Sequence, residues 1–347
     1  MVTGMKFRKY LKHVIYIFIY YFGILYVVVR VQKKIKRKFP AIILFYHRFH
    51  QKKKKEVILP SLEISEFRKQ LLHLKRYYAF ITMDEIAATL REGRDFSAPC
   101  IVITIDDGYL DNYELAYPFL VETGISSTIY LATGLIGSNL GLWVDDLEFG
   151  LIHGENKSFG FRELFGEGLV KISTNVEKEK ALDMLYGAMV GMDNVRRKEA
   201  IGKLFDLLKV EKSKLRDRPR VMLNPEEIRE MAKDGICFGA HSVSHPCLSA
   251  TPIDSGKEEI RASKETVERW VKKQVRHFAI PNGKKDDFTE ELRDFCKKIG
   301  FDTIVTTEPG LVDSRADRFS LGRILPSGPL YYFACEVARY FFWRRDR

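Results

Sequence analysis

The sequence has little that would point to a disulfide scaffold, a repeat protein or a disordered chain. Its cysteines are few, odd in number and without paired spacing: Cys100, Cys237, Cys247, Cys296 and Cys335. We therefore expect buried free thiols, which weakly favour a reducing compartment. Apart from short lysine runs there is no low-complexity tract, and 46% of the residues are hydrophobic against 30% charged. This composition is typical of a globular protein and argues against intrinsic disorder.

Acidic residues are missing before Glu56, although the whole chain has a net charge of +11. The basic residues of this region are Lys6, Arg8, Lys9, Lys12, Lys33, Lys34, Lys36, Arg37, Lys38 and the run Lys52–Lys55. They flank an apolar stretch and do not alternate with exposed aromatic residues. We therefore expect an anionic membrane surface as the partner of this region, and no nucleic acid.

That apolar stretch, Val14–Val29, has no charged residue and ends before Arg30. It is shorter than the roughly 20 residues that a spanning helix needs, although snorkelling by Lys12 and Arg30 could extend it. No small-residue cleavage site follows, so we do not expect a removed signal peptide. A membrane span, an amphipathic helix in the headgroup layer and a core helix stay open, and the basic flanks favour membrane contact. We predict a membrane-associated segment over residues 1–38.

After Pro40, short β-rich runs alternate with amphipathic helical patterns, which predicts parallel strands joined by helices. The expected strands are Ala41–Tyr46, Cys100–Ile105, Ser126–Leu131, Ile236–Ala240, Val275–Ile280, Asp302–Val305 and Leu321–Leu325. Such a pattern predicts an α/β fold, an incomplete barrel over residues 39–347 whose chemistry gathers at the carboxyl ends of the strands. Polar helical segments between about Gly134 and Leu223 interrupt the alternation, and we expect them to form a helical insertion.

Two acids, Asp106 and Asp107, come directly after the expected strand Cys100–Ile105. Their place at a strand end suggests a functional use, because barrel enzymes carry their working residues there. A turn in which the acids only cap the helix beginning near Asn112 explains the pair equally well. The acid pair alone therefore leaves both interpretations open.

Two histidines, His241 and His245, follow the expected strand Ile236–Ala240 in the same way. Imidazoles four residues apart can converge on one ion, whereas a lone histidine is more often structural. Two imidazoles and one carboxylate leave an open position for water, and the second carboxylate could remove a proton from that water during attack on a carbonyl. The strand Val275–Ile280 runs into a turn, Pro281-Asn282-Gly283, whose N–H groups could face the developing oxyanion. The pattern is that of a metal-dependent hydrolase.

Together these segments resemble the polysaccharide deacetylase family, which is the NodB homology domain of carbohydrate esterase family 4. Thr104–Tyr109 is similar to its T-F-D-D-G motif, His241–His245 to its H-S-x-x-H motif, and Phe278–Gly283 to its F-A-Y-P-Y-G motif. Leu44–Arg48 and Trp143–Asp145 resemble the L-x-Y-H-R and W-W-D elements of bacterial exopolysaccharide members. The resemblance covers about residues 40–330, apart from most of the insertion.

The resemblance implies a distorted barrel of about seven strands and removal of N-acetyl groups from a poly- or oligosaccharide. It implies Asp106 as general base, and Asp107, His241 and His245 as ligands of a divalent ion. Zinc is the first candidate for this ion, and cobalt, nickel or iron also suit these donors. The other implied site residues are Asn282, whose N–H would hold the oxyanion, and the substrate contacts Tyr109, Pro281 and Trp143. The exopolysaccharide subgroup also implies a membrane-associated protein of the bacterial cell envelope, on a side of the membrane that the two basic flanks leave open.

The sequence departs from the family pattern at two catalytic positions. Ala279 replaces an arginine that orients the base, and we expect Arg323 as its substitute, although a surface salt bridge would explain Arg323 as well. No histidine follows His277, so the late histidine that protonates the leaving amine is absent, and we expect His47 in that role. Hydrolysis of a small non-sugar amide and an inactive carbohydrate-binding protein are the alternative functions.

Overall fold

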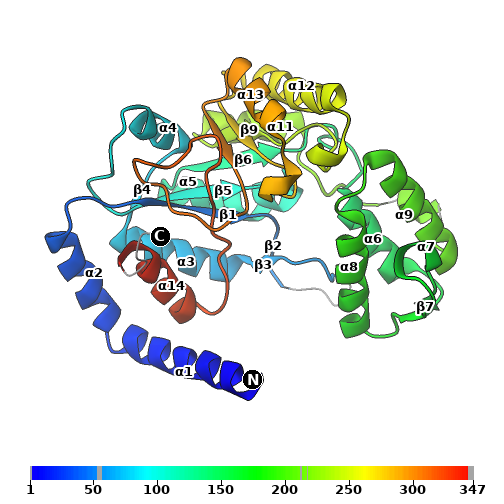
Figure 1. The fold of residues 1–347 in the computed structure, drawn as a ribbon, viewed down its shortest axis with the longest axis horizontal. Coiled ribbons are helices and arrows are strands. Elements are labelled where there is room, and N and C mark those ends of the chain that lie inside the picture. The colour runs from blue at the N-terminus through cyan, green and yellow to red at the C-terminus, as the bar shows by residue number, and fades with distance from the viewer. Residues whose placement is uncertain (1, 53–56, 212, 217, 343–347) are drawn as a thin grey trace.

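A parallel β-sheet forms the centre of the molecule (Figure 1). The computed structural model describes residues 2–52, 57–211, 213–216 and 218–342, so part of the Lys52–Lys55 run lies outside the described residues. The strands of the sheet lie side by side in the order β1 (Ala41–Tyr46), β5 (Cys100–Ile105), β6 (Ser127–Leu131), β9 (Cys237–Ala240), β10 (His277–Ala279) and β11 (Thr303–Val305), with β4 (Ala79–Phe80) also paired to β5. Six of the seven expected strands are thus confirmed.

The expected seventh strand, Leu321–Leu325, is wrong as a strand. Its residues form only isolated parallel bridges, from Leu321 to Val305 of β11 and from Ile324 to Leu44 of β1. The ladder is interrupted because the N–H of Arg323 donates to the carbonyl of Glu308, outside any strand, at 2.9 Å. The segment nevertheless joins the last strand to the first, so the sheet curves into a half-barrel that this closing segment completes.

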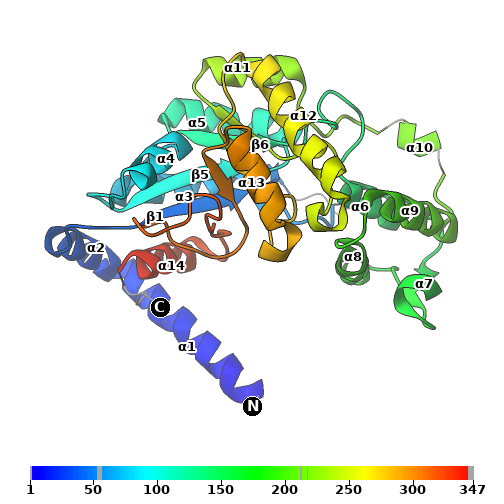
Figure 2. The same cartoon turned by 45° about the horizontal axis from the view of Figure 1, so that its top comes forward.

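Apolar side chains explain why these segments form buried strands. All six residues of β1 and all six of β5 are buried, as expected for parallel strands that are covered on both faces. The covering helices are α3 (Ile64–Tyr77), α4 (Met83–Arg91), α5 (Tyr117–Thr123), α11 (Pro225–Lys233), α12 (Ile253–Val271), α13 (Glu290–Lys298) and α14 (Leu330–Phe342), with the π-helical turn η1 (Asn112–Ala116) ahead of α5. Figure 2 shows α11, α12 and α13 over one side of the sheet.

The expected insertion lies to one side of the barrel and has its own apolar core (Figures 1 and 2). Leu147, Leu185 and Leu204 are fully buried in this core, which also takes in Ile58 and Leu59 from the loop between β2 (Phe49–His50) and β3 (Leu62–Glu63). The elements of the insertion are α6 (Trp143–His153), β7 (Ser158–Phe159), α7 (Arg162–Phe165), β8 (Val170–Lys171), α8 (Asn175–Met189), α9 (Asn194–Leu208) and α10 (Ser213–Arg216).

The N-terminal segment is two helices and not the single apolar helix expected over Val14–Val29. α1 (Val2–Tyr21) and α2 (Ile24–Ile35) are bent by 76° at Gly23, whose φ of 71° is a left-handed conformation that ends a helix. Among the described residues no single helix is long and apolar enough to cross a membrane, and the bent pair meets that criterion only when its two halves are taken together.

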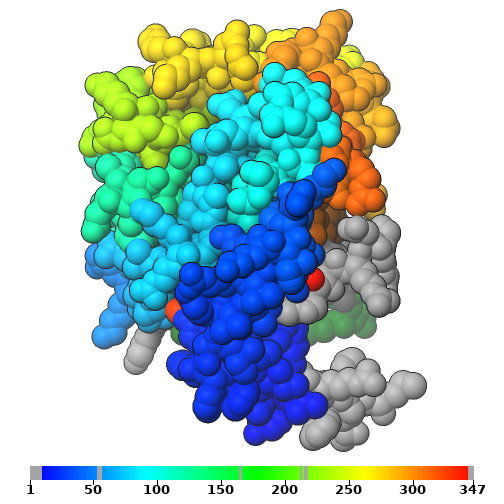
Figure 3. Space-filling view, turned by 90° about the vertical axis from the view of Figure 1, so that its left-hand side faces the viewer, coloured from blue at the N-terminus to red at the C-terminus, as the bar shows by residue number. Residues whose placement is uncertain are grey.

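Polar contacts fix α1 to the C-terminal helix α14. The Tyr16 hydroxyl donates to Glu336 Oε1 at 2.5 Å, and Lys12 Nζ lies 2.9 Å from the same oxygen. Leu25 and Val29 of α2 are buried in the main core. Figure 3 shows the coloured part of the helix pair, in dark blue, on the lower part of this face of the molecule. The helix pair is therefore packed against the barrel along part of its surface.

Candidate active site

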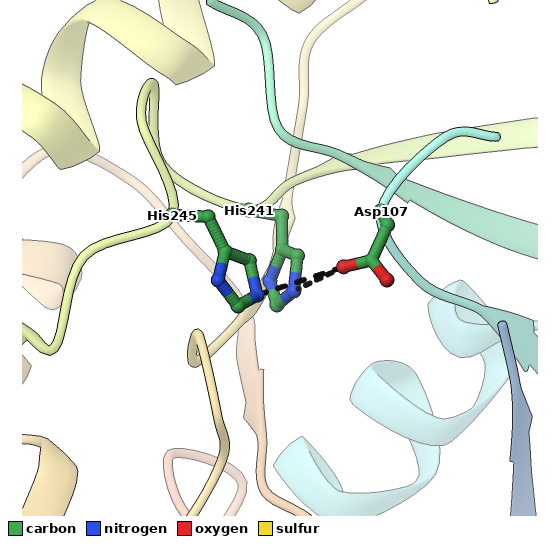
Figure 4. Close-up of side chains that lie close together, drawn as sticks. All are labelled: Asp107, His241 and His245. Carbon is green, nitrogen blue, oxygen red and sulfur yellow. Dashed lines mark ion pairs between the residues drawn. The ribbon is translucent and has the colours of Figure 1, made fainter. Parts of the chain in front are cut away.

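Three side chains that follow β5 and β9 converge on one point (Figure 4). Asp107 Oδ1 lies 3.4 Å from His241 Nε2 and 3.5 Å from His245 Nε2. Ligands placed about 2.1 Å from a tetrahedral ion are separated by about 3.4 Å, so the spacing of these atoms fits such an ion. Asp107 Oδ1 is also buried without a hydrogen-bond partner among the described residues, and coordination to a cation would satisfy this oxygen. The donor set and its spacing therefore fit a divalent metal.

The histidines present the nitrogens that a cation needs. His241 Nδ1 lies 2.8 Å from the carbonyl oxygen of Ala279, and because a carbonyl only accepts, the neutral ring carries its proton on Nδ1 and presents the lone pair of Nε2 to a cation. Burial would lower the pKa of His241, but Asp107 and Asp106 outweigh it and raise that pKa, so a cation would compete with a proton for Nε2. Burial lowers the pKa of His245 to about 4, so this imidazole is neutral at pH 7. Burial would raise the pKa of Asp107, but the neighbouring histidines outweigh it and hold that pKa well below its usual range. Asp107 is therefore ionised, and the ligand set is ready for a cation.

The loop between the two histidines is held by a residue that the sequence did not reveal. Glu259 of α12 accepts hydrogen bonds from the N–H groups of Val243 and Ser244, both at 2.8 Å, and from the Ser244 hydroxyl at 2.6 Å. The loop needs this support because Ser242 and His245 have φ values of 64° and 54°, which are unfavourable for residues other than glycine. No local motif marks Glu259, so only the fold could show this contact.

The second acid, Asp106, is bound by Arg323 on the closing segment. Arg323 Nη1 and Nη2 each lie 2.7 Å from one oxygen of the carboxylate, and both residues are buried. Nε of the same guanidinium donates to the carbonyl of Thr306 at 2.9 Å, which fixes its orientation. Burial would raise the pKa of Asp106, but the Arg323 charge outweighs it and holds that pKa below its usual range. The carboxylate is thus charged and fixed beside the triad.

Two further expected residues lie at the same place. His47 follows β1, and its Nε2 is 3.9 Å from Asp106 Oδ2 while its side chain stays 39% exposed. Asn282 follows β10 with a φ of 62°, and its buried Nδ2 has no acceptor within the part of the chain described. The structure therefore brings His47, Asp106 and Asn282 together with the triad, as the ends of neighbouring parallel strands should be.

A cavity of about 430 Å³ opens over these residues. Its lining includes Tyr109 and Trp143, but of the Pro281 turn it includes only the neighbours Ile280 and Asn282, so Pro281 itself lies outside the lining. The Tyr109 hydroxyl donates to Asp145 Oδ2 at 3.1 Å, and Tyr109 is only 2% exposed. The remaining lining residues are His47, Arg48, Leu59, Pro60, Asp106, Asp107, Leu142, Val144, Leu182, Asp183, Tyr186, His241, His245, Thr307 and Leu325.

Comparison with known proteins agrees with this arrangement. The sequence model described as polysaccharide deacetylase matches residues 93–304. The chain is 24% identical over 305 residues to YxkH of Bacillus subtilis (strain 168), which is named as a polysaccharide deacetylase, and this covers 85% of the chain and 78% of that protein. These matches include both the acid pair and the histidine pair.

Solved structures share the fold. The Streptococcus pyogenes deacetylase PplD, solved with acetate, superposes with a TM-score of 0.56 at 18% identity, covering 85% of this chain and 96% of PplD. IcaB from Ammonifex degensii gives 0.55 at 17% identity, covering 87% of this chain and 98% of IcaB. At these identities the likeness establishes the α/β half-barrel. The sequence match and the buried Asp-His-His triad add the family and its chemistry to this fold. The chain therefore belongs to the polysaccharide deacetylase family and is a hydrolase that deacetylates acetylated sugars.

Proposed function

We propose that the enzyme cleaves the carbon–nitrogen bond of N-acetylated amino sugars within a poly- or oligosaccharide, and that its substrate is an exopolysaccharide. The observation that carries the proposal is the pairing of Asp106 with Arg323 beside the triad of Asp107, His241 and His245. Zinc is our first candidate for the ion, and cobalt, nickel or iron suit the same donors. When bound, such an ion supplies a Lewis acid and lowers the pKa of water.

Asp106 is the general base in this proposal. Its carboxylate is charged, lies in the cavity and is held in one orientation by Arg323, so it can accept the proton of the attacking water without first rearranging. Arg323 itself is fully buried and bonds Thr306 and Thr104 besides Asp106, so it positions the base and does not face the substrate. Arg323 thus supplies from the closing segment what Ala279 lacks.

His47 donates the proton to the leaving amine. It lines the cavity, is partly exposed to the incoming sugar, and its Nε2 lies 3.9 Å from the Asp106 oxygen that Arg323 Nη2 also binds. In its charged form it can protonate the nitrogen as the carbon–nitrogen bond breaks. The backbone N–H of Asn282 is our donor to the oxyanion, since the left-handed conformation of Asn282 keeps this turn at the cavity wall.

An acetate-release assay tests this function. Purified protein is incubated with N-acetylglucosamine oligomers, with and without a chelator, and then with small non-sugar amides. We expect acetate from the oligomers only, a loss with chelator, and recovery when zinc is returned. Acetate from the amides but not from the oligomers would instead support the small-amide alternative.

An Asp106→Asn variant tests the base separately from the ligands. We expect hydrolysis to fall by at least about 100-fold, as for loss of a general base, while elemental analysis finds the same metal content as in the parent. An undiminished rate would refute the role of Asp106. A parent protein that binds metal and oligomers but releases no acetate would support an inactive carbohydrate-binding member of the family.

We also propose that residues 1–38 attach the catalytic unit, residues 39–347, to an anionic membrane of the bacterial cell envelope. The support is the exposure of large apolar side chains along the helix pair, such as Phe18 of α1 at 52% and Phe22 of the connecting turn at 71%, together with the basic last turn of α2. Because α1 is also bonded to α14, the pair would lie along the membrane surface with the barrel beside it.

Vesicle flotation tests the attachment. The full chain should float with vesicles that contain phosphatidylglycerol more than with phosphatidylcholine alone, and the double variant Phe18→Ser, Phe22→Ser should stay in the pellet fraction. If the variant floats as well as the parent, the helix pair is not the attachment site. If the parent does not float but forms a dimer that the variant loses, the apolar face binds a second copy of the chain.

A further inference from the structure

One wall of the catalytic cavity is formed by α8 of the insertion. Leu182, Asp183 and Tyr186 from this helix line the cavity together with Trp143 from the start of α6. Asp183 and Tyr186 are three residues apart, so they lie on the same face of α8. If a saccharide binds with its reacting sugar over the triad, its neighbouring sugars can therefore contact this wall.

The aromatic pair on this wall leaves Tyr186 as the accessible ring. The rings of Trp143 and Tyr186 are nearly parallel, with 5.4 Å between centroids and 10° between planes. The guanidinium of Arg197 lies 4.6 Å from the Trp143 ring centroid, and Arg197 is itself buried through bonds to the carbonyls at the end of α8. The Trp143 ring is thus contacted by both Arg197 and Tyr186 of the insertion, while Tyr186 remains 40% exposed.

Tyr186 lines the same cavity as the catalytic groups. Burial raises the pKa of Tyr186, and the carboxylates of Asp287 and Asp107 raise it further, so the phenol stays protonated and can donate a hydrogen bond. In the described part of the chain this hydroxyl has no hydrogen-bond partner. A flat, exposed ring with a free hydroxyl beside the triad suits the apolar face and the hydroxyls of a pyranose.

Asp183 is the carboxylate of the cavity lining that has no ion pair among the described residues and lies outside the triad. Asp106 is neutralised by Arg323, and the charge of Asp107 would be neutralised by the cation that the triad holds. The Asp183 side chain is exposed at the cavity and forms no ion pair or hydrogen bond with any described residue. The cavity therefore carries one free negative charge, about one helical turn from the aromatic ring, and favours a cationic group there.

We propose that α8 carries a binding site for a deacetylated amino sugar, with Tyr186 under its ring and Asp183 accepting its ammonium group. The inference rests on the proposed function, because the amine that deacetylation leaves on a polymer is a cation next to sugars that are still acetylated. The preferred substrate class is accordingly a partially deacetylated saccharide, and each reaction makes the neighbouring sugar a better substrate. This site only binds the substrate and adds no chemical step to the reaction at the triad.

Binding to two defined ligands tests the site. The ligands are a fully acetylated pentamer of N-acetylglucosamine and the same pentamer with one free amine, and the protein is the metal-loaded Asp106→Asn variant, which prevents turnover. We expect the pentamer with the amine to bind about threefold to tenfold more tightly, in line with a partly exposed ion pair, and this preference to shrink in 1 M salt.

Asp183→Asn in the same background should bring the ratio of the two dissociation constants close to one. Glu199→Gln, which removes an exposed acid of α9 outside the cavity, is the matched control and should keep the preference. Tyr186→Ala should weaken both pentamers about tenfold, since a stacked ring serves either sugar. The proposal is overturned if Asp183→Asn leaves the ratio as it was, or if the parent ratio is one. A preserved preference without acetate release from the active-site parent would refute the deacetylase function and leave this site standing.

Discussion

Glu259 offers the sharpest test of how the fold prepares the triad for its ion. Replacing Glu259 by alanine removes a carboxylate that accepts two backbone N–H groups at 2.8 Å and one hydroxyl at 2.6 Å from the loop between His241 and His245. Hydrogen bonds to a charged acceptor contribute about 1.5–3 kcal/mol each when buried, but Ser244 is exposed, so water replaces part of this loss. We expect about 1.5–3 kcal/mol less stabilisation of the loop.

The expected result is a dissociation constant for zinc that rises about 10-fold to 100-fold, since 1.4 kcal/mol corresponds to a factor of ten. Titration of metal-free protein against a competing chromophoric chelator measures it directly and needs no activity. Glu258→Ala is the matched control, because Glu258 is its neighbour on α12 and, within the part of the chain that the structure describes, pairs only with Arg261 at the surface. The reasoning fails if Glu259→Ala binds zinc within about twofold of the parent, or if Glu258→Ala weakens zinc binding equally.

Three other changes follow from contacts described above. Arg323→Met should lower the free energy of unfolding by about 3–5 kcal/mol in a denaturant titration, because the buried Asp106 would lose its bidentate partner and retain only the partly exposed His47 at 3.9 Å; a loss below about 1 kcal/mol would contradict the pairing. Burial would raise the pKa of Glu336, but its partners on α1 and α14 outweigh this and lower it to about 2 from 4.5. Because its pKa is lowered, this carboxylate stabilises the docking of α1 fully above pH 4.5 and loses that effect as the pH falls toward 2. Proteolysis within α1 should therefore accelerate between pH 5 and pH 3 and stay constant between pH 8 and pH 6. Gly239→Ala would place a Cβ in collision with the ring of Tyr130 on β6 and should destabilise the fold by about 1–3 kcal/mol, whereas Gly187→Ala on α8, with no atom within 4 Å, should be neutral or stabilising by thermal melting.

The sheet and the triad were predictable because both depend on local patterns repeated along the chain. Each strand of the barrel is an apolar run with a helix after it, and the acids and histidines both follow such runs, so the parallel topology alone brings Asp107 to His241. The order of the strands places only β6 between β5 and β9, which explains how residues more than a hundred positions apart become neighbours.

The rest depends on contacts that leave no local pattern. The break at Gly23 follows from a backbone conformation, and the docking of α1 follows from Glu336 at the other end of the chain. Glu259 has the spacing of an ordinary helix surface residue, so nothing near it in the sequence marks its contact with the histidine loop. The sequence left two roles open for Arg323, a partner of the base and a surface salt bridge. Only the path of the closing segment shows that Arg323 lies buried in the barrel interior.

The way in which the barrel is completed decides how small a working enzyme can be. The family match ends at residue 304 and begins at residue 93, so it contains the three cation ligands but neither His47 nor Arg323. These two come from opposite ends of the catalytic unit, which meet where Leu44 bridges Ile324 and Ala41 bridges Val312. A fragment trimmed to the matched stretch would contain Asp107, His241 and His245 but lack His47 and Arg323, which contact the Asp106 carboxylate, so under the proposed mechanism we expect it to lose catalysis even where it still binds a cation.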